Sequence, residues 1–176
     1  MRSRYTIREP GGPYFISCTV VQWIPLFTRK PYLDILLDSL QFCRQHKALK
    51  VHAYVILDNH LHLVVAGPNL ADIIRDFKSY TAKSLIARLE QDQKTWVLNQ
   101  LQYYKQTTKT KSAYQVWQEG FHPQQIISEE MLRQKIDYLH HNPVRAGLVA
   151  QPEDWVYSSA GDYAGGKGLI ELDSLI

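Results

Sequence analysis

The chain has 176 residues, of which 45% are hydrophobic and 21% charged, and a formal net charge of +3. This composition is ordinary for a folded protein, and the length suffices for one domain with a sizeable core. No apolar run approaches the roughly 20 residues of a membrane-spanning helix, and no apolar signal segment follows the basic N-terminus. We therefore expect a cytoplasmic protein. Cys18 and Cys43 fit no metal-binding spacing and are expected to be buried thiols.

The pattern of apolar residues predicts alternating strands and helices. Runs rich in β-branched and aromatic residues indicate strands, whereas apolar residues at every third or fourth position indicate amphipathic helices. Asp58 and Asn59 supply turn chemistry between two strand runs, which are therefore expected to pair as a hairpin. In chain order the expected elements are strand 14–20, helix 33–47, strands 51–57 and 60–66, helix 70–91, a helix fragment 96–104, strand pieces 115–117 and 124–127, and a helix that follows Ser128 and ends near Asn142 and Pro143.

This order of elements is that of a split βαβ unit. It predicts an α+β fold, a ferredoxin-like sandwich in which an antiparallel sheet carries helices on one face. Residues 1–160 are expected to form the domain, and residues 161–176, which are rich in glycine, a loosely attached C-terminal tail. Segment 107–112 is expected to be a mobile loop.

The first candidate for chemistry is a pair of histidines in strand 60–66. Residues two apart on a strand point to the same face, so His60 and His62 stand together, opposite Leu61 and Leu63. Two neighbouring imidazoles suit a metal ion. A histidine on a half-buried strand is more often structural, so the spacing leaves both interpretations open.

Two residues of the last predicted helix would complete a metal site. Tyr138 and Asn142 are four positions apart and therefore share a helix face. An amide oxygen together with two imidazoles suits Mg²⁺ or Mn²⁺ and leaves coordination positions open for a phosphodiester. Tyr138 would then be a nucleophile toward phosphorus. On spacing alone, a packing role for Tyr138 and a helix-stop role for Asn142 stay open.

A basic, aromatic stretch suggests a nucleic-acid partner. Between Gln93 and Gln118 lysines alternate with tryptophans and tyrosines, and no acidic residue interrupts them. Cations neutralise phosphates and flat rings stack on bases, which suits single-stranded nucleic acid. The polar side of helix 70–91 adds further cations. The alternative for this stretch and for each of these side chains is an ordinary solvated surface.

Four ordered segments carry a resemblance to a known family. They are 59–63 (NHLHL), 77–81 (FKSYT), 116–121 (VWQEGF) and 137–149 (DYLHHNPVRAGLV), the last followed by Trp155, Ser158 and Ser159. Together they resemble the HUH single-tyrosine transposases of single-strand insertion sequences, and most closely the REP-associated tyrosine transposases. The resemblance covers roughly residues 10–160.

The resemblance implies an enzyme that cleaves and rejoins single-stranded DNA next to a hairpin through a covalent phosphotyrosine intermediate. It implies that His60, His62 and Asn142 bind Mg²⁺ or Mn²⁺ and that Tyr138 is the catalytic nucleophile. The expected partner is a single-stranded DNA hairpin, bound by a monomer or homodimer at the nucleoid. The predicted DNA contacts are Lys78, Lys83, Lys105, Lys109, Lys111 and Arg145.

Two other functions remain open at this stage. A metal-dependent phosphodiesterase that activates water would need the histidines but not Tyr138. A non-catalytic binder of structured nucleic acid would need neither.

Two features also depart from the family pattern: Asp58 stands where a proline is common, and segment 92–112 is longer than in compact members.

Overall fold

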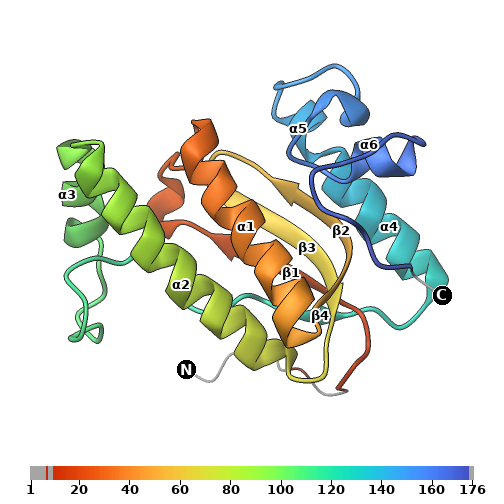
Figure 1. Ribbon diagram of the computed structural model, residues 1–176, viewed down its shortest axis with the longest axis horizontal. Helices are drawn as coiled ribbons and strands as arrows, with labels where there is room; N and C mark the ends of the chain where they lie inside the picture. The colour runs from red at the N-terminus through yellow and green to blue at the C-terminus, as the bar shows by residue number, and fades with distance from the viewer. Residues whose placement is uncertain (1–6, 8–9, 175–176) are drawn as a thin grey trace.

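The computed structural model describes residue 7 and residues 10–174. Its strands are β1 (Tyr14–Thr19), β2 (Lys50–Ile56), β3 (His60–Ala66) and β4 (Gln124–Gln125), and its helices are α1 (Lys30–Lys47), α2 (Leu70–Gln91), α3 (Thr95–Tyr103), α4 (Glu129–His140), α5 (Asn142–Arg145) and α6 (Ala160–Tyr163), with short 3-10 turns η1 (Val21–Trp23) and η2 (Pro152–Asp154) (Figure 1). The longer elements lie within a few residues of their predicted positions.

The four strands form one antiparallel sheet in the order β2-β3-β1-β4. The β2–β3 hairpin lies beside β1, and the short β4 pairs with the other edge of β1. The predicted α+β class and antiparallel sheet are confirmed. The predicted strand piece 115–117 is reduced to a single bridge between Val20 and Trp117.

Helices cover both faces of this sheet. On one face Ile16 and Leu63 pack with α1 and α2, which lie side by side in Figure 1. On the other face Phe15 and Val64 pack with Ile136 of α4. The prediction of helices on one face holds for α1 and α2 but missed the position of α4. The physical reason is that the central strands are apolar on both sides and so must be covered on both.

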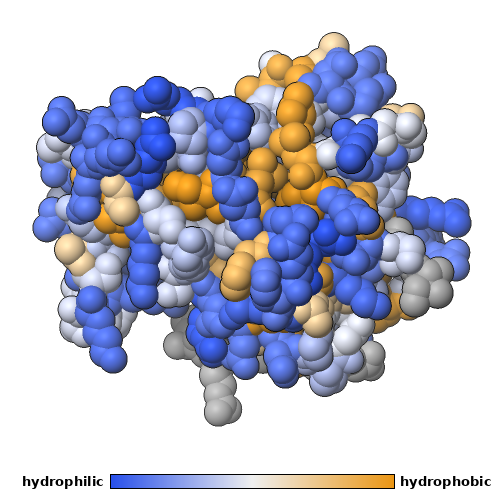
Figure 2. All heavy atoms as spheres, in the orientation of Figure 1, coloured by the Kyte–Doolittle hydropathy of each residue, from blue (hydrophilic) through white to orange (hydrophobic). Residues whose placement is uncertain are grey.

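The surface is hydrophilic where α1 and α2 face away from the sheet. Figure 2 shows polar side chains over most of this side of the molecule, with hydrophobic ones gathered between α1 and α5. Cys18 and Cys43 are buried free thiols, as predicted. Among the described residues, no helix combines the length and apolar character needed to cross a membrane.

The segment after Gly161 is held against the domain and is not loosely attached. Ile170 is buried in the core of the α1–α2 face. The carboxylate of Asp173 accepts hydrogen bonds from the Val51 backbone N–H at 2.8 Å and from Arg44 Nε at 3.0 Å. These contacts join the end of the chain to β2 and α1. The domain boundary at residue 160 stays a prediction.

Candidate active site

The two histidines lie at the start of β3, on the face that α4 covers. His60 pairs in register with Thr19, and His62 with Ser17. Their ring centroids are 4.9 Å apart. His62 is buried and its ring stacks on Phe15 at 5.2 Å. The strand therefore presents two imidazoles together, as the alternation of the sequence predicts.

Hydrogen bonds around Asn59 define which nitrogen of His60 remains for a ligand. Asn59 Nδ2 donates to the carbonyl of Trp23 at 3.1 Å, which sets the orientation of the amide. Its Oδ1 lies 2.6 Å from Nδ1 of His60. Because an amide oxygen only accepts, His60 carries its proton on Nδ1 and offers the lone pair of Nε2. This arrangement is typical of a metal-binding histidine.

Ser17 holds the ring of His62: its Oγ lies 2.7 Å from Nδ1 and shares a hydrogen bond with it. Burial, together with the neighbouring His60 and Lys135, lowers the pKa of His62 to about 3. Burial also lowers the pKa of His60, against the opposing effect of Asp58. Both rings are therefore neutral at pH 7, the form in which imidazole binds a metal.

Helix α4 brings Tyr138 to the histidines. The hydroxyl of Ser128 accepts the Met131 backbone N–H and caps the start of this helix. Ile136 and Leu139 anchor its apolar side on the sheet. Tyr138 lies beside them with its ring centroid 5.7 Å from that of His62. Its side chain is 41% exposed, so a substrate has access to the phenol.

Asn142 and Arg145 flank this tyrosine from α5. Asn142 Nδ2 donates to the carbonyl of Tyr138 at 3.2 Å, which leaves Oδ1 as a ligand atom. The guanidinium carbon of Arg145 is 5.0 Å from the centroid of the Tyr138 ring, a cation–π geometry. Pro143 falls in the first turn of α5, where its missing N–H costs nothing.

The side chains present define what kind of cation would fit. Within the described residues, no group of three or more His, Cys, Asp or Glu side chains could hold a metal ion. The ligand atoms available to a cation at this place are the imidazole nitrogens of His60 and His62, and the Asn142 amide oxygen as the third ligand stays a prediction. Such a neutral nitrogen and oxygen set fits Mg²⁺ or Mn²⁺ with positions open for phosphate oxygens.

The predicted DNA contacts fall into two groups. Lys83, Lys111 and Arg145 are exposed. The other three are engaged with the protein: Lys109 pairs with Glu119 at 2.6 Å, Lys105 Nζ donates to the Lys109 carbonyl at 2.8 Å, and Lys78 Nζ donates to the carbonyls of Gln118 and Gly120.

Lys78 differs most from its prediction as a surface cation. Burial lowers the pKa of its ammonium group. Its hydrogen bonds to Gln118 and Gly120 join α2 to the segment that returns from α3. Its role as a DNA contact stays a prediction.

Three supporting residues were missed by sequence reasoning. Asn59 could have been noticed as the polar neighbour of His60. Phe15 and Ser17 touch His62 only because of the register between β1 and β3. That register depends on the tertiary fold and leaves no local signal.

The fold and these side chains define a ferredoxin-like α+β protein that carries a histidine pair, a tyrosine and an asparagine on one side of its sheet. No protein-family model matches the chain. A putative REP-associated tyrosine transposase of Haemophilus influenzae is 24% identical over 149 residues, 85% of this chain and 80% of the relative. A REP-associated tyrosine transposase of Escherichia coli is 26% identical over 171 residues, 97% of this chain and 87% of the relative.

A solved structure shares the fold. It is that of a REP-associated tyrosine transposase bound to a REP hairpin, with a TM-score of 0.69 and 18% sequence identity over all of this chain and 94% of that one. The resemblance predicted from four sequence segments is thus confirmed: over most of its length the chain is similar to proteins called REP-associated tyrosine transposases.

Proposed function

We propose that the protein is a DNA transposase of the nickase-ligase type, which cleaves and rejoins single-stranded DNA at hairpin sequences through a covalent bond to Tyr138. The observation that carries the proposal is the convergence of α4 and β3, which leaves 5.7 Å between the ring centroids of Tyr138 and His62. The names of the two relatives and the REP hairpin in the similar structure support it.

The reaction exchanges one phosphate ester for another. The Tyr138 phenol loses its proton, and its oxygen forms an ester bond with a phosphorus atom of the DNA. The bond from that phosphorus to the deoxyribose oxygen on the opposite side breaks, and the departing oxygen takes up a proton. Attack by a DNA hydroxyl on the phosphotyrosine restores a phosphodiester and frees Tyr138, so the ester needs no ATP to reseal.

The surrounding side chains position these atoms. His60, His62 and Asn142 would hold Mg²⁺ or Mn²⁺, which when bound supplies Lewis-acid stabilisation of phosphate oxygens. The cation of Arg145 lies against the Tyr138 ring and favours both phenolate and phosphate there. The histidines and the tyrosine come together within one chain, so the site does not need a residue from a second copy. A monomer and a homodimer both remain predictions.

The test is covalent capture of DNA. Hairpin oligonucleotides with single-stranded flanks, incubated with the protein and Mn²⁺, should yield a protein–DNA adduct that survives denaturing electrophoresis. Tyr138→Phe should abolish it because the nucleophilic oxygen is gone. Tyr103→Phe, at a tyrosine that is 79% exposed on α3, is the matched control and should form the adduct normally.

The two alternatives give different results in the same assay. Cleavage that persists in Tyr138→Phe without an adduct indicates a phosphodiesterase that uses water. Hairpin binding without cleavage at any cation concentration indicates a non-catalytic binder. Either result would refute the nickase-ligase proposal.

A further inference from the structure

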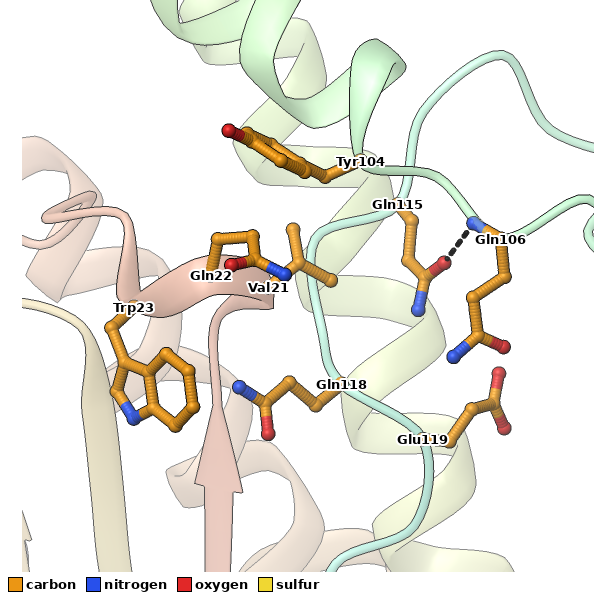
Figure 3. A pocket seen from close by; sticks show the side chains of 8 residues that line it. All are labelled: Val21, Gln22, Trp23, Tyr104, Gln106, Gln115, Gln118 and Glu119. Carbon is orange, nitrogen blue, oxygen red and sulfur yellow. Dashed lines mark hydrogen bonds between the residues drawn. The ribbon is translucent and has the colours of Figure 1, made fainter.

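The sheet that carries the two histidines is bonded on both sides to further segments of the chain. On the β1 side, the segment that includes Gln118 runs beside η1 and the end of β1 (Figure 3), and the Gln118 N–H donates to the Thr19 carbonyl at 2.8 Å. On the β2 side, the segment after η2 lies along the strand and forms a bridge between Val55 and Ser158. The histidines therefore lie on a fixed sheet, and the geometry of the site depends on where α4 holds Tyr138.

The apolar side of α4 does not by itself fix the rotation of this helix. Ile136 and Leu139 pack on the sheet, but apolar contact is non-directional. Successive residues of a helix are about 100° apart around its axis. Tyr138 and His140 therefore project to opposite sides of Leu139, which faces the sheet. A small roll of the helix on its apolar side would move Tyr138 away from the histidines unless the opposite side is held.

His140 holds that opposite side through a buried hydrogen bond. His140 and Ser159 are both buried, and Nε2 of the imidazole lies 2.8 Å from Oγ of the serine. Ser159 is itself bonded to β2 in two ways. Its Oγ accepts the Tyr54 backbone N–H at 2.9 Å, and its own N–H donates to the Tyr54 carbonyl at 2.9 Å. One serine hydroxyl thus connects the end of α4 to the backbone of β2.

The connection reaches the sheet next to the histidine pair. Ser159 bonds β2 one residue before Val55, which pairs in register with His62. The ring of Tyr163 lies against that of His140, with 4.9 Å between the centroids, and its hydroxyl donates to the His52 carbonyl of the same strand at 2.9 Å. A hydrogen bond restricts angle as well as distance. The imidazole therefore has one defined place against β2.

We propose that His140 is a positioning residue, whose hydrogen bond to Ser159 fixes the rotation of α4 so that the Tyr138 oxygen meets the phosphorus of the bound DNA. The inference rests on the proposed function, because it takes Tyr138 as the nucleophile. Misplacement of a reacting group by about 1 Å can cost about 100-fold in rate. A contact that never touches the substrate would thus control the rate of the reaction.

The first test is single-turnover kinetics of adduct formation on the hairpin oligonucleotide with Mn²⁺. His140→Leu fills a similar space but cannot form the hydrogen bond, so the rate constant at saturating protein should fall by about 100-fold. Hairpin affinity, measured by fluorescence anisotropy, should stay close to that of the wild type, because phosphate and base contacts supply it. His140→Gln should recover most of the rate, since its amide nitrogen reaches about as far as imidazole Nε2.

The neighbouring histidine provides a matched control. His141 is exposed, and its Nδ1 lies 2.9 Å from the Asp137 carbonyl of its own helix. His141→Ala should therefore form the adduct at the wild-type rate. Ser159→Ala removes the partner and leaves the imidazole in place, and it should lower the rate as His140→Leu does. The test thus stands even if His140→Leu fails to fold.

The second test follows the position of Tyr138 without catalysis. 3-Fluorotyrosine placed at position 138 reports the surroundings of the ring by ¹⁹F NMR. The wild type, His140→Gln and His141→Ala should share one resonance, whereas in His140→Leu and Ser159→Ala it should shift or split. Because the side chains of Tyr138 and His140 project to opposite sides of the helix, a shift reports movement of the ring.

The two tests separate this inference from the catalytic proposal. A shifted resonance in His140→Leu, with no adduct from the wild type, supports control of Tyr138 by His140 and refutes the nickase-ligase. An adduct formed by His140→Leu and Ser159→Ala at the wild-type rate, or no recovery in His140→Gln, overturns the positioning role alone. Equal losses of rate and hairpin affinity in these variants indicate a merely structural contact and also overturn it.

Discussion

At the level of single residues, the orientation of one amide decides the ligand atom of His60. Asn59 contacts the Trp23 carbonyl through Nδ2 and His60 through Oδ1. The other histidine depends on Ser17, whose position follows from strand register. The sequence predicts the histidine pair because its spacing is local. It does not predict these partners, which tertiary contacts supply.

Removal of either histidine should separate binding from cleavage. In His60→Ala and His62→Ala we expect adduct formation to be abolished, because the proposed cation loses an imidazole. Hairpin affinity should fall by less than about threefold, since phosphate and base contacts supply most of the binding. Electrophoretic mobility shift and adduct assays on the same oligonucleotide measure both. Unchanged cleavage in both variants would refute the metal assignment.

Loss of the Asn59 side chain should weaken binding of the proposed cation without removing one of its ligands. Asn59→Ala should raise the Mn²⁺ concentration for half-maximal adduct formation by about 10- to 100-fold, as is usual for partners that orient a ligating histidine. Asn59→Asp keeps an acceptor for His60 and should restore most of the affinity. Asn99→Ala, at an exposed asparagine of α3, is the control. Equal Mn²⁺ requirements in Asn59→Ala and the wild type would contradict this role.

At the level of elements, the candidate site exists only because α4 packs on the face of the sheet that carries the two histidines. Local periodicity predicted this helix and its start at Ser128, and the cap is present. The periodicity could not say which face of the sheet the helix covers, because an apolar stripe fits any apolar surface of suitable shape. His140 illustrates the same limit: it is 7% exposed, and its Nε2 lies 2.8 Å from Ser159 Oγ. Nothing local distinguishes it from the exposed His141.

The C-terminal segment should contribute stability that depends on pH. Burial opposes ionisation of Asp173, but hydrogen bonds from Arg44 and the Val51 N–H hold its pKa below that of an ordinary aspartate. A lowered carboxyl pKa stabilises the fold above the unfolded-state pKa, and this contribution disappears as pH falls through the folded-state pKa. Because the Asp173 side chain is 30% exposed, water screens these contacts, and Asp173→Asn should cost about 1 kcal/mol of unfolding free energy at pH 7.

Urea unfolding of the wild type and Asp173→Asn at several pH values measures this contribution. The difference between them should shrink as pH falls below about 4, where the carboxylate of the unfolded chain takes up its proton. Glu171→Gln, whose carboxylate is 83% exposed and lies 3.8 Å from Arg44, is a control that should change stability little. A difference that is independent of pH would argue against an ionised Asp173 as the cause.

At the level of the whole molecule, the modest net charge conceals an uneven distribution. Between α2 and β4, residues 93–118 carry lysines and aromatic residues without an acidic one. The structure shows that some of these lysines also bond the protein, as Lys109 does with Glu119. Sequence reasoning identified the stretch from its composition but could not separate solvated lysines from engaged ones, since that depends on which loops lie side by side.

Joint replacement of three lysines should reduce the salt dependence of DNA binding. In the variant Lys105→Ala/Lys109→Ala/Lys111→Ala, the slope of log affinity against log salt should flatten by up to about 2, since each phosphate contact to a single strand contributes about 0.7. Replacement of Lys30, Lys50 and Lys167, all exposed and outside this segment, makes the same change in net charge. An unaltered slope, or an equal effect of both triple variants, would count against DNA contacts by this segment.

The most direct measurement is to identify the residue that carries the DNA. The covalent product formed with a hairpin oligonucleotide and Mn²⁺ is digested with a protease and a nuclease, and the modified peptide is sequenced by mass spectrometry. The account predicts a nucleotide phosphate on Tyr138 and on none of the other ten tyrosines of the chain. A nucleotide on a different residue, or cleaved DNA with no modified peptide, would contradict it.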